Sequence, residues 1–233
     1  MKEQRKASST KPASSRPRKI RIFIVDDHPM MRQGLSQLIG NEPDLELCGE
    51  AEDAGTAVEQ IDQLNPDLAI IDISLRSGNG IELIKDLQGR RPELPVLVLS
   101  MHDESLYAER VLRAGGRGYV MKQEGGKKIM QAIRQVLAGQ TCVSPAISSQ
   151  ILDSVAGRRK PAASPVETLT DREFEVFQLI GQGRATKQIA QQLRVSVKTA
   201  EVHRVNIKKK LKIGSIPELI RFAVRWGEAK TPQ

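Results

Sequence analysis

Cysteine is scarce in this 233-residue chain, and its scarcity argues against two kinds of site. Cys48 and Cys142 stand far apart, and neither has a Cys or His neighbour at the spacing of metal ligands. We therefore expect no disulfide framework and no zinc site, and a reducing cytoplasm is the expected location. Long apolar runs are missing as well, and residues 1–19 lack the apolar core of a secretory signal. A membrane partner is therefore not expected.

Acidic charge is scarce at both ends of the chain, although the middle has an excess of it. Residues 1–19 carry a net charge of +6 and residues 20–140 a net charge of −6. Residues 169–233 carry 13 Lys and Arg against 6 Asp and Glu, a net charge of +7. This asymmetry predicts two domains with different partners, and it favours a nucleic acid as the partner of the basic C-terminal domain.

Two segments are predicted to lie outside the folded domains. Residues 1–19 are rich in Ser, Lys, Arg and Pro, which predicts a disordered basic tail. Residues 141–168 contain "GRRKPAASPVE", a composition typical of a flexible linker, after a possible short helix at about Pro145–Val155. The folded domains are therefore predicted to be residues 20–140 and 169–233.

The first domain alternates between short apolar runs and helical patterns. The predicted strands are Ile20–Val25, Leu45–Gly49, Leu68–Asp72, Val96–Ser100 and Gly118–Val120. The predicted helices are Pro29–Ile39, Thr56–Leu64, Gly80–Leu87, Ser105–Ala114 and about Gly126–Ala138. This alternation indicates an α/β fold, a five-stranded parallel sheet with helices on both faces, and 2-1-3-4-5 is the strand order that we expect for it.

The second domain shows helical periods without a strand pattern between them. Four short helices are predicted, which makes this a separate all-α domain. Their expected bounds are Asp171–Gly181, Lys187–Leu193, Val197–Leu211 and Ile216–Trp226.

Polar residues stand at the ends of four predicted strands. Asp26 and Asp27 follow the first strand, Asp72 ends the third, Ser100 ends the fourth, and Lys122 follows the fifth. Because chemistry in such sheets gathers at the carboxyl ends of the strands, we expect these side chains to share one pocket. Gathered carboxylates suit Mg²⁺ as a cofactor. A carboxylate held beside Mg²⁺ and a lysine can attack a phosphoryl group and become an aspartyl phosphate.

Motifs in both domains resemble one known family. The ordered set "VDDH", "IIDISL", "VLVLSMHDE" and "GYVMK" resembles the receiver domain of two-component response regulators, which has a flavodoxin-like fold. The run "LTDREFEVFQLIGQGRATKQIAQQLRVSVKTAEVHRVNIKKKL" resembles the helix-turn-helix domain of the NarL/FixJ (LuxR-type) family. The resemblance covers nearly all of the chain except the tail and the linker.

The resemblance implies a role for each residue of the pocket. The phosphoacceptor falls on Asp72. The implied Mg²⁺ ligands are Asp26 (through water), Asp27, Asp72 and the main-chain carbonyl of Ser74. The implied switch hydroxyl, phosphate-binding lysine and rotating aromatic are Ser100, Lys122 and Tyr119. A phosphoryl group brings about −1.5 to −2 charges and three acceptor oxygens, which Ser100 and Lys122 would meet.

The sequence departs from the family pattern at two places, whereas two histidines near the pocket match it. Leu75 and Arg76 replace a common Met-Pro pair, and "KQEGGKK" follows where the family usually has a proline or a small or acidic residue after the lysine. Neither change removes a group that the chemistry needs. His28 and His102 are expected to form ordinary surface or hydrogen-bonding contacts.

The C-terminal domain is predicted to read DNA with its third helix. Thr170 begins "TDRE", which fits a helix-capping box, and Ser196 is expected to cap the helix that enters the major groove and to anchor a phosphate there. The resemblance places base contacts on Glu201, Val202 and Val205. The expected phosphate contacts are Lys198, Thr199, Arg204 and Lys208, and Lys209 lies on the same outward side.

The sequence as a whole predicts a phosphorylation-controlled DNA-binding transcription regulator and not an enzyme. Its expected partners are a sensor histidine kinase, double-stranded DNA and, once phosphorylated, a second copy of the chain. One alternative is a DNA-binding regulator that ignores phosphorylation and uses the receiver only to dimerise. Another is an aspartate-nucleophile phosphatase, although that class needs a second aspartate two residues after the nucleophile, where Ser74 stands.

Overall fold

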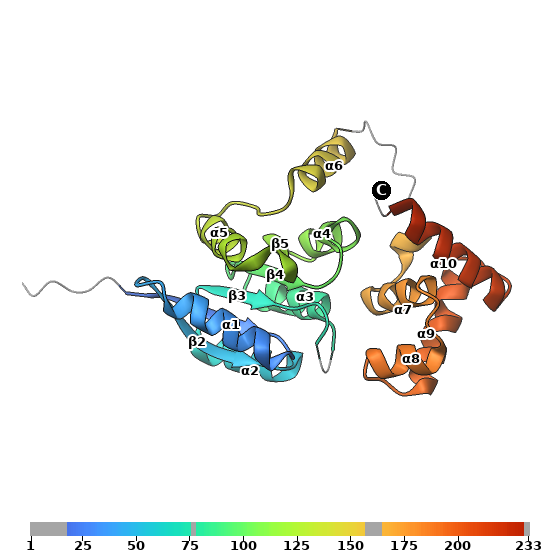
Figure 1. Cartoon of the computed structure of the whole chain (residues 1–233), viewed down its shortest axis with the longest axis horizontal. Coiled ribbons are helices and arrows are strands. Elements are labelled where there is room, and N and C mark those ends of the chain that lie inside the picture. Colours follow the sequence, from blue (N-terminus) through green and yellow to red (C-terminus); the bar gives the residue numbers. More distant parts are fainter. Residues whose placement is uncertain (1–17, 76–77, 157–164, 231–233) are drawn as a thin grey trace, which may run out of the picture.

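The computed structural model describes residues 18–75, 78–156 and 165–230. It shows a sheet domain followed by a group of helices that stands beside it (Figure 1). All but the last two residues of the predicted disordered tail lie outside the described residues, as does most of the "GRRKPAASPVE" linker. Within those described ranges, no helix has the length and apolar character needed to cross a membrane.

The first domain contains a five-stranded parallel sheet of order β2-β1-β3-β4-β5, as predicted. Its strands are β1 (Ile20–Val25), β2 (Leu45–Ala51), β3 (Leu68–Ile71), β4 (Val96–Ser100) and β5 (Gly118–Met121). The helices are α1 (Pro29–Gly40), α2 (Ala54–Leu64), α3 (Gly80–Arg90), α4 (Glu104–Arg113) and α5 (Gly125–Leu137). A single 3-10 turn, η1 (Lys122–Glu124), separates β5 from α5.

Alternation along the strands explains why helices cover both faces of the sheet. In β1, Ile22 and Ile24 pack with α1 and α5, whereas Phe23 and Val25 face the core that α2, α3 and α4 cover. All four side chains are buried, because successive residues of a strand point to opposite faces. A run of consecutive apolar residues is therefore the pattern that this central strand requires.

The chain adds one further bridge to the outer edge of the sheet after α5. Cys142 forms an isolated parallel bridge with Gly118. The Cys142 amide donates to the Arg117 carbonyl over 2.9 Å, and the Tyr119 amide donates to the Cys142 carbonyl over 2.8 Å. The helix α6 (Pro145–Val155) begins shortly afterwards, where the sequence predicted a short helix.

Within residues 165–230 the C-terminal domain shows four helices, as predicted, after a 3-10 turn. These elements are η2 (Pro165–Thr168), α7 (Asp171–Gly181), α8 (Thr186–Gln192), α9 (Val197–Lys210) and α10 (Ile216–Lys230). Thr170 and Glu173 form the predicted capping box of α7: the Glu173 amide donates to the Thr170 hydroxyl over 3.3 Å, and the Thr170 amide donates to the Glu173 carboxylate over 2.9 Å. Both ends of this box satisfy amides that a helix N-terminus leaves free.

Helix α7 packs directly against the sheet domain. Tyr107 of α4 is fully buried, and its ring lies 5.3 Å from that of Phe174, edge to face. The hydroxyl of Tyr107 donates to Oε1 of Gln178 over 2.7 Å. One hydrophobic cluster therefore continues from the sheet domain into the helical domain.

Candidate functional site

Three carboxylates meet at the carboxyl edge of the sheet. Asp26 and Asp27 follow β1, and Asp72 follows β3, which ends at Ile71, one residue earlier than predicted. The Asp72 amide donates to the Val25 carbonyl over 2.8 Å, which holds the two strand ends side by side. All three aspartates are buried. We refer to Asp26, Asp27 and Asp72 as the acidic pocket.

Lys122 is the cation at the bottom of the acidic pocket. Its Nζ lies 2.7 Å from Oδ2 of Asp26 and 2.7 Å from Oδ2 of Asp72, and its side chain is only 3% exposed. Burial raises the pKa of Asp72 to about 6, although Lys122 pulls it down. Burial alone would lower the pKa of Lys122, but the charges of Asp72 and Asp26 outweigh burial and raise it. The lysine is therefore held as an ammonium ion against two carboxylates.

The donor atoms of the acidic pocket fit a hard cation. Asp26, Asp27, Asp72 and the neighbouring His28 each offer one ligand atom, and these atoms lie within 4.8 Å of one another. The imidazole of His28 already pairs with one of these carboxylates, because its Nδ1 lies 2.7 Å from Oδ1 of Asp27. The Ser74 amide donates to Oδ1 of Asp72 over 3.3 Å, which keeps the Ser74 main chain beside the cluster. Three carboxylates and a main-chain carbonyl are oxygen ligands of the type that Mg²⁺ prefers.

Ser100 and Tyr119 meet at the main chain of His102. Ser100 is fully buried at the end of β4, and its hydroxyl accepts from the His102 amide over 3.2 Å. Tyr119 is also buried, and its hydroxyl donates to the His102 carbonyl over 2.8 Å. The imidazole of His102 lies 2.9 Å from the Ser74 hydroxyl, and burial lowers the pKa of His102 to about 4. His102 thus has the hydrogen-bonding role expected from the sequence.

The helical domain closes the mouth of the acidic pocket. Both domains line a cavity of about 400 Å³ there, and Asp27, Asp72, Glu175 and Arg194 are among the lining residues. Nη1 of Arg194, in the turn before α9, contacts Oδ2 of Asp27. Nδ2 of Asn79 donates to Oε1 of Glu175 over 3.0 Å. We call this the closed arrangement.

No pattern in the sequence points to the residues that hold the closed arrangement. Arg194 lies between two predicted helices, just after Lys187–Leu193, and Glu175 is one polar residue in an amphipathic helix. Burial raises the pKa of Glu175 to about 7, although Arg172 lies 2.7 Å from its Oε2 and pulls the pKa down. The sequence contains one signal for Glu175, namely that this acidic residue stands beside apolar residues of the same predicted helix.

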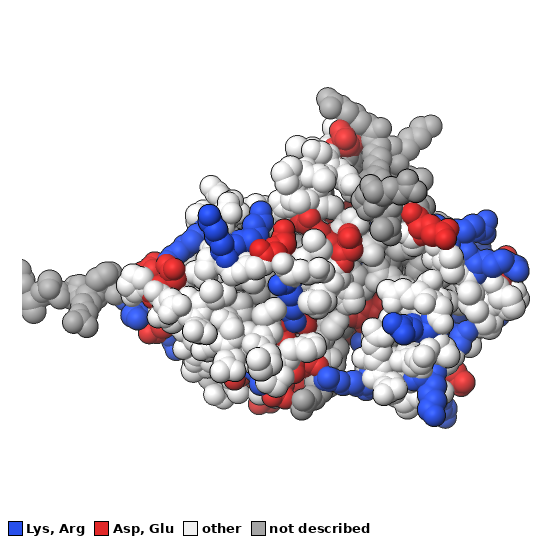
Figure 2. Space-filling view, viewed as in Figure 1, with Lys and Arg blue, Asp and Glu red and all other residues white. Residues whose placement is uncertain are grey.

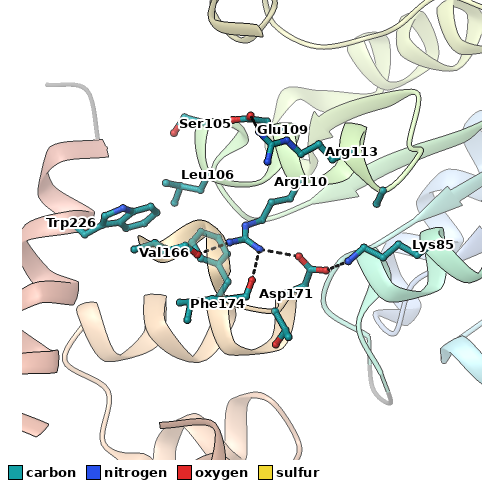
Figure 3. A pocket seen from close by; sticks show the side chains of 13 residues that line it. Lys85, Ser105, Leu106, Glu109, Arg110, Arg113, Val166, Asp171, Phe174 and Trp226 are labelled. Atoms are coloured by element: carbon teal, nitrogen blue, oxygen red, sulfur yellow. Dashed lines mark hydrogen bonds and ion pairs between the residues drawn. The ribbon is translucent and has the colours of Figure 1, made fainter. Parts of the chain in front are cut away.

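A second group of charges joins the domains at the N-terminus of α7. Asp171 lies between Nζ of Lys85 on α3, at 2.7 Å, and Nη1 of Arg110 on α4, at 3.1 Å (Figure 3). Arg110 also donates to the carbonyls of Val166, over 3.0 Å, and Leu169, over 3.2 Å. These contacts border a cavity of about 270 Å³. We call them the Asp171 bridge.

Helix α9 presents the predicted DNA-contacting residues toward solvent. Ser196 caps it, and its hydroxyl accepts from the Thr199 amide over 3.0 Å. Val202 is 50% and Val205 is 48% exposed, so the receiver leaves this side of the helix open in the closed arrangement. The other exposed positions among the predicted contacts are Ser196, Lys198, Glu201 and Lys209, whereas Thr199, Arg204 and Lys208 are half-buried.

Basic side chains gather over the C-terminal helices (Figure 2). Not all of them are free for a phosphate in this structure. Nη1 of Arg204 contacts the Thr186 hydroxyl of α8, and Lys210 lies 2.6 Å from Glu173. Arg204 would therefore have to exchange Thr186 for a phosphate to play its predicted role.

Comparison with protein families identifies both domains. Residues 22–134 match the response regulator receiver domain, and residues 167–223 match the family described as bacterial regulatory proteins, luxR family. The chain belongs to the NarL/FixJ family of response regulators. It joins a receiver domain to a LuxR-type DNA-binding domain, the combination of a phosphorylation-controlled transcription regulator and not of an enzyme. Receiver domains generally bind Mg²⁺ at an acidic pocket.

Individual relatives cover between 59% and 91% of this chain. Transcriptional regulatory protein DegU of Brevibacillus brevis is 30% identical over 226 residues, which span 91% of this chain and 96% of the relative. A LuxR-family response regulator of known structure from Aurantimonas is 33% identical, with a TM-score of 0.54, over 59% of this chain and 99% of that one. The regulator RcsB, in a structure of two dimers bound to two parallel DNAs, is 25% identical, with a TM-score of 0.53, over 88% of this chain and 97% of that one.

Proposed function

We propose that Asp72 is the phosphoacceptor of this transcription regulator and that a sensor histidine kinase supplies the phosphoryl group. The observation that carries the proposal is the position of Asp72: a buried carboxylate, 2.7 Å from a buried ammonium group, beside two further aspartates. An oxygen of Asp72 attacks the phosphorus, the bond from phosphorus to the donor's nitrogen breaks, and the donor keeps that electron pair. The product is an acyl phosphate on Asp72.

The neighbouring residues have separate tasks in this transfer. Asp27 would hold Mg²⁺ together with Asp72, the Ser74 carbonyl and, through water, Asp26, and the ion would neutralise charge on the phosphoryl oxygens. The ammonium group of Lys122 lies within hydrogen-bonding distance of the Asp72 carboxylate. It would therefore be close enough to move from that carboxylate to a phosphoryl oxygen once Asp72 carries the phosphoryl group. These groups stabilise charge and position the reactants, which is most of what catalysis of phosphoryl transfer requires.

The switch in this proposal runs through Ser100 and Tyr119. The two side chains meet at His102, so a phosphoryl group that draws the Ser100 hydroxyl inward would also disturb the hydrogen bond of Tyr119. Tyr119 is packed inward in this structure, with its hydroxyl engaged. Phosphorylation would bias this pair toward a second packing on the α4–β5 side of the receiver.

The output of the switch is binding to double-stranded DNA through α9, by a dimer of the phosphorylated chain. The side chains of Glu201, Val202 and Val205 are exposed on α9. Their exposure supports contacts with base edges in the major groove. The RcsB dimers on DNA support the pairing, because two half-sites read together multiply two weak contacts.

An acyl-phosphate donor tests the phosphoacceptor directly. The parent chain should gain one phosphoryl group in the presence of Mg²⁺ and lose the gain when the metal is chelated, as seen by mass spectrometry of the intact protein. Asp72→Asn and Asp27→Asn should gain none, and Asp27→Asn should also lose Mg²⁺ binding while keeping the fold. Asp62→Asn, on the exposed side of α2, is the matched control and should behave like the parent. Equal labelling of parent and Asp72→Asn would contradict the assignment.

A further inference from the structure

The turn of the helix-turn-helix motif reaches the acidic pocket with a cation. Arg194 has a left-handed backbone, with φ of 52°, between α8 and α9. Its amide donates to the Gln191 carbonyl over 3.2 Å, and the next amide, of Val195, donates to the Ala190 carbonyl over 2.9 Å. These bonds fix the turn, and the Arg194 side chain leaves it toward the receiver, where it meets Asp27.

Asp27 is the carboxylate of the pocket that Lys122 does not reach. The Lys122 ammonium lies against Oδ2 of both Asp26 and Asp72, whereas the guanidinium of Arg194 lies against Oδ2 of Asp27. Asp27 is 4% exposed and Arg194 is 46% exposed, so the pair joins a buried anion to a cation at the mouth of the pocket. A buried carboxylate needs such a partner, because its charge has been removed from water.

We infer that Arg194 occupies the metal position of Asp27 as a tethered cation, so that Mg²⁺ binding and the closed arrangement exclude each other. The inference rests on the proposed role of Asp27 as a metal ligand. Whichever oxygen of Asp27 the metal ion takes, it stands on the same carboxylate as the guanidinium on Oδ2, and the two cations repel each other. A bound Mg²⁺ therefore displaces the guanidinium, and with it the contact that holds the turn before α9 on the receiver.

The coupling acts in both directions. If closure weakens Mg²⁺ binding by some factor, Mg²⁺ must weaken closure by the same factor, because the two events share one free-energy cycle. The DNA-binding domain would thus regulate access to the phosphorylation site. This device differs from a cover over the DNA-contacting face, because Val202 and Val205 remain exposed in the closed arrangement.

Arg194→Asn tests the inference in the full chain. Asparagine tolerates the left-handed backbone that Arg194 adopts, and Arg194→Gln is a second variant that keeps more of the side-chain length. Both should bind Mg²⁺ about fivefold to tenfold more tightly than the parent in calorimetry, because a cation that competes for Asp27 has been removed. The matched control is Arg184→Asn, which removes an exposed arginine of the same domain that does not line the cavity. It should leave the Mg²⁺ affinity unchanged.

Small-angle X-ray scattering supplies the second measurement. Saturating Mg²⁺ should increase the radius of gyration of the parent, whereas Asp27→Asn should not respond. A parent that binds Mg²⁺ in calorimetry and keeps its compact scattering would overturn the mutual exclusion. Equal Mg²⁺ affinity of the parent and both Arg194 variants would overturn the role of Arg194 and leave the metal site standing. If neither the parent nor the variants bind Mg²⁺, the metal site of the proposed function is wrong, and the inference falls with it.

Discussion

Replacing Arg110 by alanine should open the contact between the two domains. Arg110 lies on the receiver helix α4 and holds the helical domain in three ways. It pairs with the buried Asp171 over 3.1 Å and donates to the carbonyls of Val166 and Leu169. Its guanidinium also lies 4.1 Å from the centre of the Phe174 ring.

The size of the effect follows from these contacts. Hydrogen bonds that involve a charged group contribute about 1.5–3 kcal/mol, and a cation–π contact contributes about 0.5–2 kcal/mol. Lys85 still neutralises Asp171 in the variant, which limits the loss. We therefore expect about 3 kcal/mol in favour of the open arrangement, which changes the ratio of closed to open molecules on the order of a hundredfold.

Two measurements report the change, and α4 provides the control. Trp226 is the chain's single tryptophan and borders the cavity beside Arg110 (Figure 3), so its fluorescence should respond to opening. The radius of gyration should rise in the same samples. Arg113→Ala removes a cation one turn further along α4, whose contact is with Glu109 on the same helix, and should leave both signals unchanged. If Arg110→Ala gives the same scattering and fluorescence as Arg113→Ala, the Asp171 bridge does not hold the domains together.

Two further predictions concern pH and DNA. The pKa of Glu175 is raised to about 7 from its ordinary value of 4.5 in the closed arrangement, where its neighbours are Asn79, Arg172 and Asp171. Protonation of the Glu175 carboxyl therefore favours the closed arrangement. This contribution to the stability of the closed arrangement is fully present below about pH 4.5 and is lost as the pH rises through 7. The radius of gyration should accordingly increase between pH 5.5 and 8, and Glu175→Gln should remove that dependence. For DNA, Lys208→Ala should weaken binding to all sequences alike and reduce the slope of affinity against salt by about one, whereas Val202→Ala should change the preference at one base pair. Binding-site selection at two salt concentrations separates these outcomes, and an unchanged salt slope in Lys208→Ala would contradict a phosphate contact.

The sheet and its acidic pocket could be predicted because they depend on local patterns. A strand such as β1, buried on both faces, must be apolar throughout, and this leaves a visible run in the sequence. Asp26, Asp27 and Asp72 interrupt or follow such runs, so their convergence follows from the parallel topology alone. The strand order then brings Lys122 to the same edge, although it lies 50 residues beyond Asp72.

The contacts between the domains could not be predicted in the same way. Arg194 meets Asp27 across 167 residues, and Asn79 meets Glu175 across 96, without a periodicity that relates the partners. Each pair depends on how two finished surfaces fit, and a charged residue on either surface looks like an ordinary solvated one. Tyr107 shows the same limit: the sequence predicts its helix, but its full burial follows from the position of α7.

The bridge at Cys142 joins the chain after α5 directly to the edge strand of the sheet. The Tyr119 amide is hydrogen-bonded to the Cys142 carbonyl, so the strand that carries the proposed switch residue and the segment that leads to α6 are directly joined. The 11 residues of α6 form a rod about 16 Å long. Ile147 of that rod is buried in the same hydrophobic cluster as Tyr119, so a change in the packing of β5 reaches α6 through side-chain contacts as well as through the bridge. The proposed switch is therefore connected to the end of α6 at Val155 by a route that does not use the Asp171 bridge.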